Sequence, residues 1–153
     1  MNPISDRFLA NDTFNFFVDG TECSRTERAT TISNWSVAKE DLKVCWQHPD
    51  YSKNCGVCEK CIRTMLNSKV VGVDFLPCMP SPLQISQLKK EDLVTQPHVL
   101  EFYKKCLSYA DKNKTLDREW RKTLSDQILI WQSSKIEAEQ TNSNVIRKLR
   151  KLM

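Results

Sequence analysis

The 153-residue chain has only three glycines, and each stands alone, at Gly20, Gly56 and Gly72. Proteins that hold nucleotide phosphates often do so with a glycine-rich loop, because its backbone N–H groups can approach the phosphate closely and point at it. The chain contains no S-G-G, no Walker-type loop and no G-x-G-x-x-G. We therefore expect that it neither binds nor cleaves ATP by itself.

Long apolar runs are also missing. No stretch approaches the roughly 18 consecutive apolar residues of a membrane span. The opening residues, MNPISDRFLAND, carry charges and a proline where a secretory signal is apolar. We therefore expect a cytoplasmic protein without a membrane span. In that reducing compartment the seven cysteines, an odd number, favour metal binding or reactivity over disulfides.

Histidine is scarce as well. Only His48 and His98 are available as histidine general bases, and neither has a recognisable serine or cysteine partner in the sequence. We therefore expect no catalytic residue in this chain.

What the chain does have is a cysteine cluster in the run KVCWQHPDYSKNCGVCEKC. Its last three cysteines form a tandem C-x2-C-x2-C, and nine residues separate them from the first. This spacing is typical of a closed tetrahedral zinc site, in which four thiolates surround the ion at about 2.3 Å. Gly56 suits the tight turn between two ligands, which often needs a positive φ. The predicted ligands are Cys45, Cys55, Cys58 and Cys61.

Four protein ligands leave no open position for water, so the predicted zinc is structural rather than catalytic. Lys60 and Arg63 flank the last ligand, where positive charge offsets the formal −2 charge of four thiolates around zinc. Two alternatives for the ligand set stay open. Cys78 is the first substitute if Cys45 is not a ligand, and His48 either replaces a thiolate or is solvated, which we favour.

Hydrophobic patterning predicts an α+β fold that is mostly helical, with short strands, the four-cysteine zinc site and a C-terminal helical extension. We expect strands at 13–18 and 42–46, and helices at 21–34, 59–71, 97–110 and 116–139. Three prolines near residue 80 mark a boundary. The expected organisation is a zinc-binding part at 1–80, a helical extension at 81–140 and a basic tail at 141–153.

The helical spacing also predicts which side chains form the core. We expect Gly72 to cap the end of the helix at 59–71 and Thr115 to cap the start of the helix at 116–139. The expected buried faces are Ile62, Met65, Leu66 and Val70; Val99, Phe102, Tyr103, Cys106, Leu107 and Ala110; and Leu116, Trp120, Leu124, Ile128 and Trp131.

The cysteine followed after nine residues by CGVCEKCIRTM resembles the zinc site of the PP-loop, or adenine nucleotide alpha-hydrolase-like, superfamily. Within it, the pattern is most similar to 7-cyano-7-deazaguanine synthase and related ExsB-like proteins. The upstream run DGTECSRTERATTIS also looks like the C-terminal half of that superfamily. The resemblance covers about residues 13–80. It implies a remnant of an α/β fold and a parent protein that acts as an ATP-dependent ligase.

The resemblance further implies that Arg25 and Arg28 contact a phosphate, although a solvated helix face shared with Glu22 and Glu27 explains them equally well. The superfamily's SGGxDS phosphate loop is missing. The chain therefore resembles the zinc-bearing C-terminal portion of such a protein, inactive alone, with a separate ATP-binding half or another protein chain as its partner.

A second hypothesis is a free-standing zinc module that binds a protein or a nucleic acid through its helical extension. The tail at 141–153 has a net charge of +4, so residues 1–140 sum to zero. Four charges at one end predict only weak, salt-sensitive binding to nucleic acid.

Overall fold

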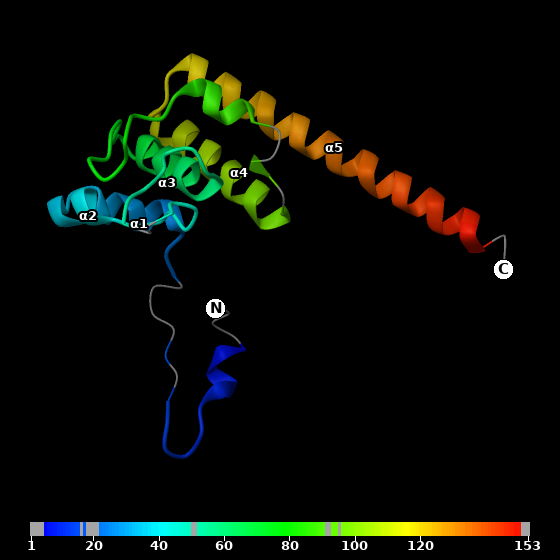
Figure 1. The fold of residues 1–153 in the computed structure, drawn as a ribbon, viewed down its shortest axis with the longest axis horizontal. Helices are drawn as coiled ribbons and strands as arrows, with labels where there is room; N and C mark the ends of the chain where they lie inside the picture. The colour runs from blue at the N-terminus through cyan, green and yellow to red at the C-terminus, as the bar shows by residue number, and fades with distance from the viewer. Residues whose placement is uncertain are drawn as a thin grey trace.

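The computed structural model describes residues 5–15, 17, 22–49, 52–90, 93–94 and 96–150, and of residues 6, 7, 138 and 141–150 the backbone alone. The described chain is mostly helical (Figure 1). Its α-helices are α1 (Arg25–Ile32), α2 (Ser36–Asp41), α3 (Glu59–Val70), α4 (Pro97–Asn113) and α5 (Arg118–Arg150). Two short 3₁₀ helices, η1 (Asp6–Leu9) and η2 (Ile85–Lys89), complete the order.

The core lies where α3, α4 and the first half of α5 pack together. The expected face of α3 is buried, with Ile62, Leu66 and Val70 fully inaccessible to solvent. On α4 the expected face is buried except for Leu107, which is partly exposed. The Tyr103 ring lies 5.0 Å from the Trp131 ring, centroid to centroid, and so joins α4 to α5. Helical periodicity therefore predicted most of the core correctly.

The ends of the helices differ from the predicted ends for local reasons. The helix expected at 21–34 begins at Arg25, because Ser24 is its N-cap. The Ser24 hydroxyl accepts the Glu27 N–H, and the Glu27 carboxylate accepts the Ser24 N–H. The helix expected after Thr115 begins at Arg118, because the Asp117 carboxylate accepts the Trp120 N–H at 2.9 Å. Thr115 is therefore not the cap.

Gly72 lies directly after the C-cap of α3, with a φ of 90°. The Gly72 N–H donates to the Lys69 carbonyl, and the Val73 N–H donates to the Ser68 carbonyl. These two bonds form a Schellman motif, which satisfies carbonyls at the helix end and favours glycine.

Neither expected strand forms within the described residues. Of 13–18, only 13–15 and 17 are described, and their single β-type contact is an isolated bridge between Asn11 and Phe14. The strand expected at 42–46 is wrong. The segment has no strand partner there, because the Val44 and Cys45 N–H groups both donate to the side chain of Asn54. The expected α/β remnant is thus not found in the described part of the chain.

The two ends of the described chain extend away from the helical core (Figure 1). Residues 5–17, as far as described, lie apart from the core, and the second half of α5 projects from it. No helix in the described part of the chain is long and apolar enough to cross a membrane.

Candidate metal centre

Four cysteine side chains converge between α2 and the start of α3. Their Sγ atoms all lie within 4.8 Å of one another. Two pairs, Cys45 with Cys58 and Cys55 with Cys61, have Sγ–Sγ distances of 3.9 Å. Cys58 and Cys61 are buried, and the other two are partly exposed. The group consists of the four cysteines that the spacing predicts. Cys45 and Cys55 lie in the loop before α3, and Cys58 and Cys61 lie at the N-terminus of α3.

The size of this group fits one ion. In a regular tetrahedron with metal–sulfur bonds of about 2.3 Å, neighbouring sulfurs are about 3.8 Å apart. The two pairs at 3.9 Å are close to this spacing, and the remaining pairs lie within 4.8 Å. A cluster of several metal atoms needs more widely spaced cysteines. The four sulfurs can therefore hold a single metal ion, with no position left for water.

Gly56 shapes the turn between the first two ligands of the tandem. Its φ is 72°, which confirms the expected left-handed conformation. A Cβ atom at this position would also lie 2.6 Å from Cγ of Pro80, too close for real contact. The turn allows the Cys58 N–H to point at Sγ of Cys55, at 3.3 Å.

Asn54 fixes the one ligand that lies outside the tandem. It is 6% exposed, and its Oδ1 accepts the Val44 and Cys45 N–H groups at 3.0 and 3.1 Å. Its Nδ2 donates to the carbonyls of Leu42 and Cys78 at 2.8 and 3.0 Å. One buried amide thus holds the Cys45 segment against the tandem. Sequence reasoning missed Asn54, although its position directly before Cys55 was a signal.

The environment sets different proton affinities within the group. Burial is the largest influence on Cys58 and Cys61, and it raises the pKa of both thiols. At Cys45 burial also acts upward, but N–H groups of Cys55, Gln47 and His48 and the Cys55 side chain outweigh it and lower its pKa to about 6. A metal ion that binds must therefore displace protons from the buried pair.

The two alternative ligands lie outside the four-sulfur group. His48 and Cys78 are not among the clustered ligand atoms. Cys78 instead lines a separate pocket with Asn54, and burial raises its pKa. The clustered sulfurs are thus those of Cys45, Cys55, Cys58 and Cys61, and their binding of zinc stays a prediction.

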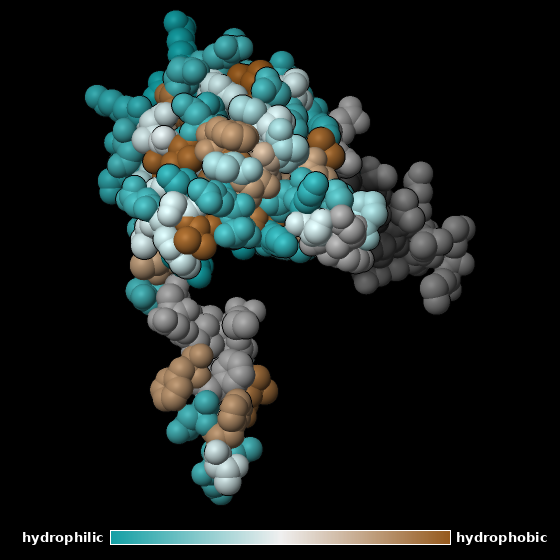
Figure 2. Space-filling model, turned by 60° about the vertical axis from the view of Figure 1, so that its left-hand side comes forward, coloured by the Kyte–Doolittle hydropathy of each residue, from teal (hydrophilic) through white to brown (hydrophobic). Residues whose placement is uncertain are grey.

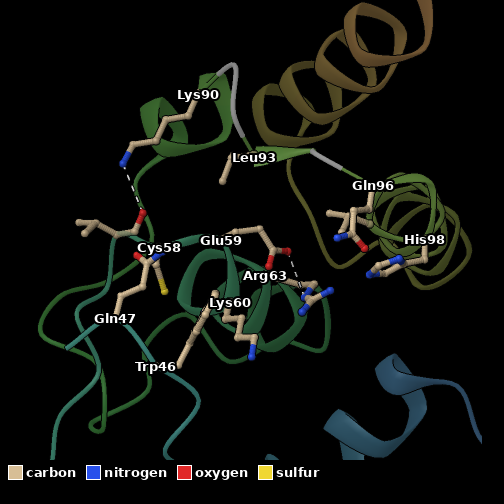
Figure 3. A pocket seen from close by; sticks show the side chains of 12 residues that line it. Trp46, Gln47, Cys58, Glu59, Lys60, Arg63, Lys90, Leu93, Gln96 and His98 are labelled. Carbon is tan, nitrogen blue, oxygen red and sulfur yellow. Dashed lines mark hydrogen bonds and ion pairs between the residues drawn. The ribbon is translucent and has the colours of Figure 1, made fainter. Parts of the chain in front are cut away.

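The cations next to the last ligand have partners of their own. The Lys60 ammonium lies 5.0 Å from the centre of the Trp46 ring, and Arg63 Nε lies 3.2 Å from Glu59 Oε1. Both cations line a pocket of about 500 Å³ beside Cys58 (Figure 3). The expected offset of thiolate charge by Lys60 and Arg63 stays a prediction.

Arg25 and Arg28 lie at a different place from the cysteines. Both line a pocket of about 280 Å³ between α1 and α3. Burial, followed by repulsion from Arg63 and Arg28, lowers the pKa of Arg25. The expected phosphate contact of these two arginines stays a prediction.

No family model matches the chain, and no curated protein or solved structure is significantly similar to it.

Proposed function

We propose that the four cysteines hold one structural zinc ion. The observation that carries this proposal is the set of four sulfurs within 4.8 Å of one another, with two pairs at 3.9 Å. Four thiolates are typical zinc ligands, and a closed set of four makes the ion structural. Zinc would tie the Cys45 segment to the start of α3 and stabilise the fold by about 10 kcal/mol or more.

On this basis, the chain serves as the zinc-bearing C-terminal portion of a PP-loop ATP-dependent protein similar to 7-cyano-7-deazaguanine synthase. It is not catalytic alone. The cysteine motif supports this assignment, and the missing glycine-rich loop explains why a partner must supply the ATP site.

The N-terminal segment gives this proposal a second support. Its apolar side chains gather away from the helical core (Figure 2). The exposed fractions are 81% for Phe8, 63% for Leu9, 51% for Phe14 and 87% for Phe17. Exposed apolar groups of this size mark surfaces that another protein covers. The occupant that we propose is the ATP-binding half.

Two titrations test this function. The chain alone, and the chain co-purified with an ATP-binding domain that carries SGGxDS, encoded immediately upstream, are each titrated with ATP and magnesium by calorimetry. We expect no ATP binding by the chain alone, because no phosphate loop exists. The complex should bind ATP. A micromolar dissociation constant for ATP with the chain alone, or the absence of any complex with such a domain, would contradict the proposal.

The alternative function, a free-standing zinc-stabilised interaction module, draws on a different observation. Three large apolar side chains on α5 are more than half exposed: Leu129 at 62%, Ile130 at 54% and Ile136 at 55%. Leu129 and Ile130 lie between the buried Ile128 and Trp131, and Ile136 follows beyond them. If no ATP-binding domain joins the chain, and substitution of these residues by serine abolishes binding to another protein, this alternative replaces the first.

A further inference from the structure

Two positive charges line the pocket between α1 and α3. Its lining contains two arginines and no acidic residue. Arg25 and Arg28 reach it from α1, and no ion pair involving either is found in the described part of the chain. An unpaired pair of like charges is unfavourable unless solvent or an anion compensates it.

The nearest acids are engaged elsewhere. Glu27, in the same helix, accepts the Ser24 N–H at 2.7 Å as part of the helix cap. Glu59 lies 3.2 Å from Arg63. Glu22, Arg25, Glu27 and Arg28 are all exposed, as a solvated helix face requires, so that alternative stays open beside an anion contact. The arginines keep their charge available.

The remaining lining is divided between polar and apolar groups. Hydrogen-bonding side chains come from Ser33, Thr64, Asn67 and Ser68, and apolar walls from Ala29, Ile32, Leu42, Val44 and Leu76. Leu76 is 5% exposed and forms an apolar floor of the pocket. A pocket of about 280 Å³ lies just below the roughly 300 Å³ at which drug-sized sites begin.

We propose that this pocket binds a small organic anion, whose carboxylate or phosphate pairs with Arg25 and Arg28 and whose apolar part contacts the Leu76 floor. Guanidinium groups suit both anions, because their planar N–H groups match two oxygens at once. The ligand proposed for this pocket is a small anion rather than ATP. The proposal therefore goes beyond the proposed function and does not depend on an ATP-binding partner.

The test uses the zinc-loaded full chain and three probes: inorganic phosphate, phenyl phosphate and benzoate. Binding is followed by calorimetry and by amide chemical shifts of α1 and α3. We expect at least one of the two aromatic probes to bind more tightly than inorganic phosphate, because only these also contact the apolar wall. Which of the two binds more tightly identifies the anionic group.

Arg25→Gln and Arg28→Gln should each weaken binding about tenfold or more, since a hydrogen bond to a charged group contributes roughly 1.5–3 kcal/mol. Arg118→Gln, an exposed arginine at the start of α5, is the matched control and should leave binding unchanged. Zinc content and melting temperature establish that each variant is folded. Equal binding by Arg25→Gln, Arg28→Gln and the wild type, tightest binding by inorganic phosphate, or no binding of any probe overturns the proposal.

Discussion

Asn54 replaces a neighbouring strand with a single side chain. A backbone segment such as 42–45 normally satisfies its N–H and C=O groups in a ladder, and here one amide supplies two donors and two acceptor positions. The apolar and β-branched residues at 42–46 are typical of a strand, but the segment forms no strand. No pattern of hydrophobicity distinguishes a ladder from an asparagine that lies ten residues away.

Asn54→Ala should weaken metal binding and lower the melting temperature. The substitution leaves partly buried N–H and C=O groups unpaired, each at a cost of up to about 1–3 kcal/mol, and releases the Cys45 segment. Competition with a chelator measures the affinity, which we expect to fall at least tenfold. Asn34→Ala, at an exposed position, is the control. An Asn54→Ala variant that holds zinc as tightly as the wild type would show that Cys45 is positioned without the amide.

The helices and the connections between them were predictable to different degrees. Three amphipathic helices were found where the 3.6-residue period indicated, because burial of one face dominates their stability. Their ends were less predictable. Thr115 and Asp117 are both good capping residues, and only the path of the chain into α5 decides in favour of Asp117. The four ligands were predictable because chelation requires local spacing, whereas the pocket between α1 and α3 depends on helix packing.

Cys106 links α4 to α3 and gives the fold a pH dependence. Its side chain is fully buried, and its Sγ donates to Oδ1 of Asn67 at 3.9 Å. Burial raises the pKa of this thiol to about 12 from an ordinary value of 9.0, against smaller opposite effects of Thr26, Arg25 and Arg63. Between these two values the unfolded chain releases a proton that the folded chain keeps. The stabilising contribution is complete below pH 9 and is lost as the pH rises toward 12.

Urea unfolding between pH 8 and 12 measures this effect. The free energy of unfolding of the wild type should fall more steeply with pH than that of Cys106→Ala, by up to about 1.4 kcal/mol per pH unit. Cys23→Ala, which removes an exposed thiol, should keep the wild-type slope. Identical slopes for all three proteins would mean that the Cys106 thiol ionises as readily in the folded state as in the unfolded state.

At the scale of the whole molecule, the C-terminal end of α5 lies beyond the core. Among the side chains of α5 that the structure describes, the buried ones are Leu124, Ile128 and Trp131, in its first half. The backbone of 141–150 continues α5 as helix. Deletion of 141–153 should therefore leave zinc content unchanged and shift the melting temperature by no more than about 2 °C. A substantially larger drop in a thermal melt would show that the tail packs on the core.

The four cysteines bring the segment before α3 against the helix on which the core is built. Their side chains lie close together, and those of Cys58 and Cys61 are buried, so a bound ion would link the two parts directly. Small domains with a modest core depend strongly on such a link. Loss of one ligand should therefore affect the whole fold rather than one loop.

The central claim is one zinc ion held by four cysteines, and metal analysis of the purified protein beside Cys58→Ser tests it most directly. We expect one zinc per chain in the wild type, and in Cys58→Ser the loss of both zinc and a cooperative thermal transition. Cys23→Ser should behave like the wild type, because this exposed cysteine lies outside the cluster. Unchanged zinc content in Cys58→Ser, or a wild type purified without any zinc, would contradict the account.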